Sequence, residues 1–298
     1  MAVDFGLVLQ PGWRPLEPAG ILDFNRQAIA RLSDHFTALW AEDHLQKGAN
    51  PALEAWTTLA FLAGEYSRYR LGTLVLGQSY RNPGLLAKMA ATLHYLSGGR
   101  LILGIGAGWQ EDEYQAFDYP FPPAGVRIAQ LAEAVELIRT LWAGSPATYQ
   151  GRYYRVEEAN CEPRLEPPPP IMIGAHGEKI LKVVARLADG WNTAGPYARY
   201  RQRDALLRRE CEAIGRNPDE ITRSVYVHAW LTSDSAAHAQ AAARLGDSGI
   251  DLLGPTSDDA IRQLRPYVEL GVSHIQVKPY DLPTIERISD EVAPAVTG

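Results

Sequence analysis

The chain has 298 residues, of which 46% are hydrophobic and 21% are charged, and it contains 26 Gly and 21 Pro. This composition is typical of a globular protein with a large core and excludes a disordered or fibrous chain. The 29 Lys and Arg against 35 Asp and Glu give a net charge of −6, which provides no general attraction to nucleic acid or to an anionic membrane surface. Neither is therefore an expected partner.

The longest strongly apolar stretch, residues 101–109, is far shorter than the roughly 18 residues of a membrane-spanning helix. The N-terminus carries Asp4 and lacks the basic start and apolar core of a signal peptide. Cys161 and Cys211 form no CxxC motif and no metal-ligand spacing, so no metal site is expected and both are interpreted as thiols of a reducing compartment. These features predict a cytoplasmic protein.

Short apolar runs alternate with amphipathic segments along most of the chain. Runs typical of strands occupy residues 4–9, 39–43, 70–76, 100–106, 171–175, 190–193, 221–230 and 274–277. Helical periodicity occupies residues 21–32, 53–64, 85–96, 127–142, 178–188, 201–214, 236–245, 258–270 and the C-terminal segment. Near-continuous apolar strands separated by helices indicate a parallel sheet that is buried on both faces.

The alternation is interrupted between residues 109 and 170. This stretch contains the helix at 127–142, an aromatic hairpin-like piece at 149–154 and the proline run 167–170. We interpret it as an insertion after the fourth strand of a single domain that spans residues 1–298. Eight strands fit a (β/α)8 TIM barrel, and an open doubly wound sheet is the alternative.

Candidate functional residues follow the predicted strands, because a parallel barrel carries its site at the C-terminal strand ends. Asp43 and His44 follow the second strand, where the imidazole can bind a cofactor or move a proton. Arg81 follows the third strand, where it can pair with an anionic group. The alternative for Asp43 and His44 is that they only cap the next segment, and the alternative for Arg81 is that it only stabilises its own loop.

Two glycine-rich segments lie at later strand ends. Gly104, Gly106 and Gly108 allow a flat ring or a phosphate to lie directly on the backbone, although they do not make a dinucleotide fingerprint. Residues 174–177 lead into a helix, whose N-terminal N–H groups suit a phosphate. The alternatives are a strand that bends as it leaves the barrel and an ordinary helix start at Gly177.

These places, in this order, resemble the luciferase-like monooxygenase superfamily, and specifically its deazaflavin-dependent branch. The likeness spans nearly the whole chain and is carried by WAEDHL (40–45), RLGTLVLGQSYRNPGLLAKMAATL (70–93), LSGGRLILGIGAGWQEDE (96–113), GRYYRVEEA (151–159) and PPIMIGAHGEKILKVVARLADGWN (169–192). The resemblance implies a homodimeric TIM barrel that binds coenzyme F420, or alternatively FMN, at the C-terminal mouth. It also implies a cis peptide bond between Leu74 and Val75 behind the cofactor ring.

The resemblance further implies a role for each segment of the site. His44 and Asp43 are expected beside the reactive ring as catalytic residues. The expected cofactor contacts are Leu74, Val75, Ala107, Gly108, Trp109, Gly174, Ala175, His176 and Gly177, with the last four around the phosphate. Arg81, Lys179 and Lys278 are candidates for binding the acidic tail of F420.

One departure from the family pattern concerns the general acid. Sugar-phosphate dehydrogenases of the branch have a glutamate where this chain has Trp109, and Glu111, Asp112 or Glu113 are the nearby carboxylates that could replace it. Trp109, Glu113 and Arg81 are the expected substrate contacts. The resulting prediction is an oxidoreductase that transfers a hydride between F420 and a small organic substrate. The alternatives are an FMN-dependent monooxygenase, because deazaflavin lacks the ring nitrogen that forms a peroxide adduct, and a cofactor-binding protein without turnover.

Overall fold

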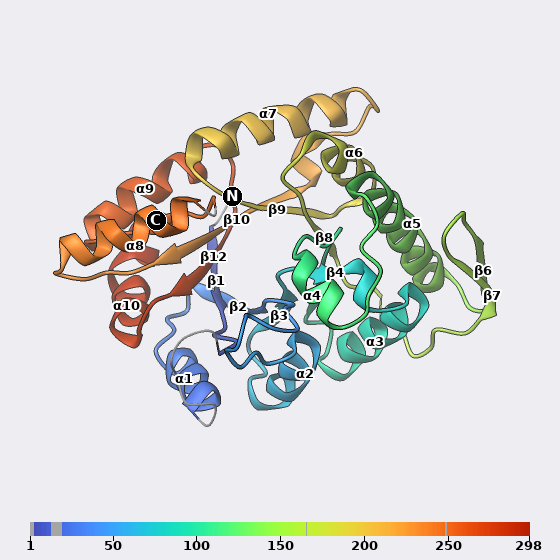
Figure 1. Cartoon of the computed structure of the whole chain (residues 1–298), viewed down its shortest axis with the longest axis horizontal. Coiled ribbons are helices and arrows are strands. Elements are labelled where there is room, and N and C mark those ends of the chain that lie inside the picture. The colour runs from blue at the N-terminus through green and yellow to red at the C-terminus, as the bar shows by residue number, and fades with distance from the viewer. Residues whose placement is uncertain (1–2, 13–19, 165, 248) are drawn as a thin grey trace.

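A computed structural model describes residues 3–12, 20–164, 166–247 and 249–298, and in it eight parallel strands close into a barrel (Figure 1). In barrel order the strands are β1 (Asp4–Val8), β2 (Phe36–Ala41), β3 (Arg70–Thr73), β5 (Leu101–Gly106), β8 (Ile171–Gly174), β9 (Gly190–Ala194), β10 (Thr222–Ala229) and β12 (His274–Pro279). The last strand pairs with the first, with Asp4 opposite His274. This closure confirms the TIM barrel and excludes the open sheet.

Helices surround the barrel on the outside (Figure 1). They are α1 (Gly20–Ile29), α2 (Ala55–Glu65), α3 (Pro83–Leu96), α5 (Ala124–Ala143), α6 (Glu178–Leu187), α7 (Tyr197–Glu212), α8 (Ser235–Asp247), α9 (Ser257–Glu269), α10 (Leu282–Arg287) and α11 (Ala293–Thr297). Short elements complete the chain: β4 (Leu76–Gly77), η1 (Gln78–Tyr80), η2 (Pro218–Glu220), β11 (Leu252–Leu253) and η3 (Ile288–Val292). Among the described residues, no helix combines the length and apolar character that crossing a bilayer requires.

The segment 109–170 leaves the barrel after its fourth strand, β5, as expected. Within it α5 packs between α3 and α6, so this helix fills the regular place of the fourth barrel helix. The additional structure is α4 (Glu111–Ala116) before α5 and the antiparallel pair β6 (Ala147–Gln150) and β7 (Arg155–Ala159) after it. Figure 1 places this pair at the outer edge of the molecule, beside α5.

The barrel interior and the helix-covered layer are two separate apolar cores. The interior core consists of Val8, Ala38, Trp40, Leu74, Ile102, Met172 and Tyr226. Trp40 is fully buried, and it fits because two facing strand positions are glycines: a Cβ at Gly6 would lie 2.3 Å from its Nε1, and a Cβ at Gly72 would lie 2.2 Å from its Cε3. Its Nε1 donates to His274 Nε2 at 2.9 Å. One indole therefore fills space between three strands.

Candidate active site

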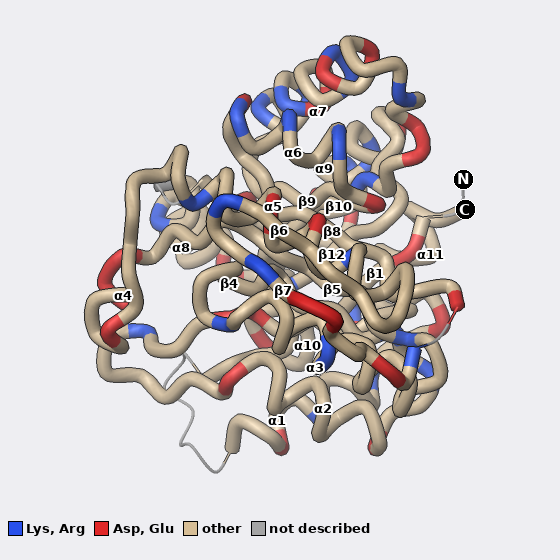
Figure 2. Tube along the Cα trace, turned by 90° about the vertical axis from the view of Figure 1, so that its right-hand side faces the viewer, with Lys and Arg blue, Asp and Glu red and all other residues tan. Residues whose placement is uncertain are grey.

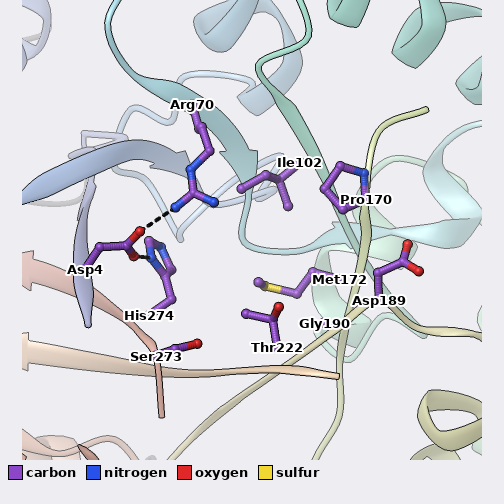
Figure 3. A pocket seen from close by; sticks show the side chains of 10 residues that line it. All are labelled: Asp4, Arg70, Ile102, Pro170, Met172, Asp189, Gly190, Thr222, Ser273 and His274. Atoms are coloured by element: carbon purple, nitrogen blue, oxygen red, sulfur yellow. Dashed lines mark hydrogen bonds and ion pairs between the residues drawn. The ribbon is translucent and has the colours of Figure 1, made fainter. Parts of the chain in front are cut away.

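A cavity lies at the N-terminal ends of the strands. It has a volume of about 320 Å³ and is lined by Asp4, Arg70, Ile102, Pro170, Met172, Asp189, Gly190, Thr222, Ser273 and His274 (Figure 3). The Asp4 carboxylate accepts from Arg70 at 2.8 Å and from Thr37 at 2.9 Å, and it also bonds Nδ1 of His274. Because Trp40 donates to Nε2 of His274, the imidazole carries its proton on Nδ1.

This cavity is assigned a structural role. Its charged groups bond one another across strand ends: Arg70 pairs with Asp4, and Asp189 accepts from Arg139 at 2.8 Å. In TIM barrels the N-terminal face serves stability, whereas the chemistry lies at the C-terminal face. The site is therefore built at the C-terminal ends, where the residues singled out from the sequence gather.

His44 lies directly after β2 and contacts two residues from the segment that leaves β5. Its Nδ1 is 2.5 Å from Oε1 of Glu113, whose side chain is buried in the first turn of α4. The second carboxylate oxygen of Glu113 accepts from the backbone N–H of Leu45 at 3.2 Å and from the Tyr80 hydroxyl at 3.1 Å. The ring of Trp109 meets the imidazole edge-on, with ring centroids 5.9 Å apart.

Asp43 points to the loop that follows β3. Its Oδ2 accepts from the Gly77 backbone N–H at 2.9 Å, and its two oxygens accept from Arg81 at 2.9 and 3.0 Å. Arg81 also pairs with Glu54, which caps the N-terminus of α2 through the N–H groups of Trp56 and Thr57. Both Asp43 and Arg81 are thus engaged within the protein, and they connect the end of β2 to the segment after β3.

The segment between β3 and β4 forms the floor of the mouth. The Leu74–Val75 peptide bond is cis, as the resemblance implies. A Cβ at Gly104 would lie 1.8 Å from the carbonyl oxygen of Thr73. The side chain of Val75 occupies the space that side chains of two neighbouring strand positions would fill: a Cβ at Gly106 or Gly174 would lie 2.9 or 2.7 Å from its methyl carbons. These glycines therefore serve first to admit Val75, and they also leave backbone at the surface on which a ring can lie.

The opposite side of the mouth carries groups suited to an anion. No side chain caps the N-terminus of α6 at Gly177, so backbone N–H groups of its first turn remain available there within the described structure. Nδ1 of His176 is 2.7 Å from the Thr193 hydroxyl, to which Arg203 donates at 2.8 Å. Arg199 and Arg203 both lie beside Gly195 at the start of α7, a helix with recurring basic positions (Figure 2).

The protonation of His176 depends on these neighbours. Desolvation, followed by the charges of Arg203 and Arg199, lowers the pKa of His176 to about 4. The pKa of Arg203 is likewise lowered by burial and by Arg199. The neutral imidazole can accept or donate hydrogen bonds at pH 7, while the two guanidinium groups supply the positive charge.

A buried ion pair occupies the mouth between β2, β10 and β12. Lys278 is 4% exposed and pairs with Glu42, which also accepts from the Tyr226 hydroxyl at 2.8 Å. The same hydroxyl is 2.7 Å from Nε2 of His228. Burial alone would raise the pKa of Glu42, but the ammonium of Lys278 outweighs burial and the pKa lies below its ordinary value. Lys278 therefore neutralises Glu42, and its contact with an acidic cofactor tail stays a prediction.

The structure brings most of the sequence-predicted residues to one end of the barrel. His44 and Asp43 follow the end of β2, Leu74 and Val75 follow β3, Trp109 follows β5, and residues 174–177 stand at the end of the neighbouring strand β8. Ala107 and Gly108 leave the end of β5, and Gly108 has a φ of +77°, with Tyr114 occupying the space of a Cβ. Lys179 lies exposed in the first turn of α6. Within the described residues, no group of His, Cys, Asp and Glu is arranged to hold a metal.

Sequence reasoning missed the role of Arg199 and Arg203, and it missed Glu42. The signal for the arginines was present, because an arginine-rich helix follows the strand at 190–194 and its first turns must lie at the mouth of a parallel barrel. Glu42 had a weaker signal, since it precedes the Asp43–His44 pair. Its pairing with Lys278, at the other end of the chain, depends on barrel closure.

Comparison with known proteins gives consistent matches. The F420-dependent glucose-6-phosphate dehydrogenase of Kineococcus radiotolerans is 35% identical over 228 residues, which are 74% of this chain and 66% of that protein. The F420-dependent hydroxymycolic acid dehydrogenase of Mycobacterium tuberculosis is 32% identical over 206 residues, 68% of this chain and 57% of that protein. The chain thus matches just under two thirds of the first relative and somewhat more than half of the second.

Solved structures support the fold. A structure of an F420-dependent secondary alcohol dehydrogenase in complex with an F420-acetone adduct superposes with a TM-score of 0.85 at 19% identity and covers 100% of both chains. The coenzyme F420 dependent tetrahydromethanopterin reductase of Methanopyrus kandleri has a TM-score of 0.80 at 20% identity and covers 99% of both chains. The family model described as luciferase-like monooxygenase matches residues 12–276. Because this match includes most of the sequence, the chain belongs to the luciferase-like monooxygenase family.

Proposed function

We propose that the chain is an F420-dependent oxidoreductase that transfers a hydride between coenzyme F420 and a small organic substrate. One observation carries the proposal: a histidine, a glycine-lined floor and a basic anion site lie at the same end of one barrel. The relatives named above are dehydrogenases that use F420. Their names support an alcohol or the corresponding carbonyl compound as the class of substrate.

The residues fit the phosphate of F420. A Cβ at Gly177 would meet nothing within 4 Å, so the space before α6 can accept a ligand group close to the backbone. The N-terminus of α6 favours negative charge, and Arg203 and Arg199 add two guanidinium groups at the neighbouring strand end. We assign the phosphate to residues 174–177 together with these two arginines, and we place the acidic tail near the exposed Lys179.

The residues also fit a flat ring. Leu74 and Val75 form a raised apolar floor, and the segment from Gly106 to Gly108 offers backbone beside it. When it is bound, the deazaflavin supplies a carbon that accepts or donates a hydride. We assign to His44, at the neighbouring strand end, the proton that accompanies the hydride, a task suited to an imidazole near neutral pH.

The remaining residues of the site position these groups. Asp43 fixes the segment after the floor through Gly77, and Arg81 holds Asp43 in place. Trp109 is 71% exposed beside His44, so its indole is the substrate contact that we propose for the open side of the mouth. An indole cannot act as a general acid, which distinguishes this site from that of a sugar-phosphate dehydrogenase with glutamate at this position.

The proposed cofactor is tested by titration of the purified protein with F420 and with FMN at the same salt concentration. We expect tighter binding of F420, and we expect Arg203→Ala to raise its dissociation constant at least tenfold because one charge-assisted partner of the phosphate is lost. Arg201→Ala is the matched control, since this exposed arginine lies on the same helix, and its dissociation constant should stay within twofold. Equal or tighter binding of FMN, or an unchanged constant in Arg203→Ala, would contradict the proposal.

We also propose a homodimer that works in the cytoplasm. Two adjacent helices of the outer ring, α2 and α3, expose large apolar side chains: Phe61, Leu85, Tyr95 and Leu96. Such side chains favour association with a second copy. The two cysteines are buried free thiols, as expected in a reducing compartment. Sedimentation velocity over a range of protein concentrations tests the dimer.

A further inference from the structure

The carboxylate of Glu113 is buried against His44, which its position in the sequence does not predict. It follows Trp109 by one helical turn, and its side chain turns inward, whereas the indole of Trp109 stays in solvent. Its backbone N–H donates to Gln110 O at 3.1 Å, which closes the first turn of α4. The chain thus places a buried carboxylate under the histidine although it lacks a carboxylate at position 109.

All three partners of this carboxylate act as hydrogen-bond donors. Oε2 accepts from the Leu45 backbone N–H and the Tyr80 hydroxyl, and Oε1 is 2.5 Å from Nδ1 of His44. An ionised carboxylate only accepts hydrogen bonds, so the proton between Glu113 and His44 belongs to Nδ1. In a neutral imidazole, Nε2 then carries the lone pair.

We propose that Glu113 is the positioning residue for catalysis: it holds His44 in the Nδ1–H tautomer so that Nε2 exchanges the proton with the substrate. This inference rests on the proposed function. In alcohol oxidation the O–H proton moves to Nε2, the carbon–hydrogen bond breaks, and the hydride leaves with its electron pair for the oxidised cofactor as the C=O bond forms. Carbonyl reduction reverses each step, with the imidazolium returning its proton to the oxygen.

Burial strengthens the electrostatic interaction between His44 and Glu113. The side chains of His44 and Glu113 are 11% and 1% exposed, so water screens their interaction weakly. An imidazolium formed during turnover is therefore stabilised by the carboxylate beside it, and the ring cannot rotate without breaking this bond. A carboxylate orients histidine in the same way in hydrolase triads, where neutralising the carboxylate costs about 10⁴-fold in kcat through the wrong tautomer.

The first test needs no cofactor. The ¹⁵N shifts of the His44 ring in the purified protein report which nitrogen carries the proton, with His44→Asn identifying the signals. We expect the Nδ1–H tautomer in the wild type. In Glu113→Gln the amide can donate to Nδ1, and we expect the Nε2–H tautomer to appear. Finding Nε2–H in the wild-type protein would overturn the proposal.

The second test follows turnover after F420 binding has been verified. We expect Glu113→Gln to lower kcat by 10²-fold or more while the F420 dissociation constant stays within twofold, and Glu113→Asp to recover part of the loss. Tyr80→Phe is the matched control, because it removes another bond to the same carboxylate but keeps the ionised partner of His44, and its loss should be below tenfold. An unchanged kcat in Glu113→Gln would overturn the proposal. Failure of the wild type to bind F420 would instead refute the proposed function, and the tautomer measurement would still decide the state of the pair.

Discussion

The imidazole of His44 and the groups proposed to hold the cofactor come from different parts of the mouth. His44 follows β2 and bonds Glu113, whereas the phosphate is assigned to residues 174–177 and α7. Removal of the imidazole therefore leaves the binding groups intact. It removes the group placed to accept or donate the proton.

We expect His44→Ala to lower the single-turnover rate by about 10²–10⁴-fold, the usual contribution of a positioned acid–base group, with a small change in F420 affinity. Rate, dissociation constant and melting temperature are measured on one preparation. A histidine with only a structural role would instead give a lower melting temperature with a nearly normal rate, and that result would remove His44 from the mechanism.

At this scale the sequence predicts which side chains stand at the end of a strand but not which of them pair across the barrel. Asp43 and His44 can be identified because strand ends in a parallel barrel share one mouth. The sequence does not show which of Glu111, Asp112 and Glu113 is the partner of His44. Only Glu113 is buried, because the position at which α4 begins turns its side chain inward. The Glu42–Lys278 pair cannot be predicted from the sequence either, because it depends on how the strands of the closed barrel are aligned.

Among the elements, the strand at 70–76 differs most from its sequence pattern. The apolar run predicts one continuous strand, whereas the structure divides it into β3 and β4 with Leu74 and Val75 between them. The hydrophobic pattern of the sequence does not predict this division, because the residues at the break, 73–76, are all apolar or small. The bend is instead indicated by the resemblance, and its fit depends on glycines that lie 30 to 100 residues further along the chain.

The packing of Val75 against its neighbouring strands gives a prediction at the element scale. A Cβ at Gly106 would lie 2.9 Å from Cγ2 of Val75, closer than real Cβ contacts allow, so Gly106→Ala must displace the floor. We expect the variant to lose about 1–3 kcal/mol of unfolding free energy in urea denaturation. Val75→Ala combined with Gly106→Ala should recover part of this loss, because the added methyl group then fills the space of a removed one.

Gly125→Ala is the control for this comparison. A Cβ there meets nothing within 4 Å, and the position lies in the first turn of α5, so its stability should stay the same or rise by up to about 1 kcal/mol. Additive losses in the double variant would contradict the contact between Gly106 and Val75.

In the molecule as a whole, the two ends of the chain meet where the barrel closes. Asp4 on the first strand binds His274 on the last strand and Arg70 on the third. Burial opposes ionisation of Asp4, but the hydrogen bonds from His274 and Thr37 and the positive charge of Arg70 outweigh it, and the pKa lies below its ordinary value of 3.8. A carboxyl group with a lowered folded-state pKa stabilises the fold above its ordinary pKa, and the contribution is lost as the pH falls through the folded-state value.

Asp4→Asn is therefore expected to lower the unfolding free energy by about 1–3 kcal/mol at pH 7, since His274 and Arg70 lose a charged acceptor. The difference in unfolding free energy between the variant and the wild type should narrow only as the pH falls below 3.8 toward the lower folded-state pKa, where the wild-type carboxylate also becomes protonated. Urea denaturation across this pH range measures it. Asp34→Asn removes a carboxylate that is 98% exposed and should change stability by less than about 0.5 kcal/mol, so an equal effect of the two variants would refute the role of Asp4.

Trp40 has a consequence for how the barrel separates its two openings. Its indole lies against Gly6 and Gly72 and reaches His274, and together with the other residues of the interior core it fills the barrel between the N-terminal cavity and the C-terminal mouth. The proposed hydride transfer benefits from a dry environment, and the buried indole of Trp40 belongs to the packing that separates the N-terminal cavity from the C-terminal mouth. Trp40 thus acts as a partition. Substitutions around the N-terminal cavity should therefore change stability without changing the access of solvent and substrate to the C-terminal mouth.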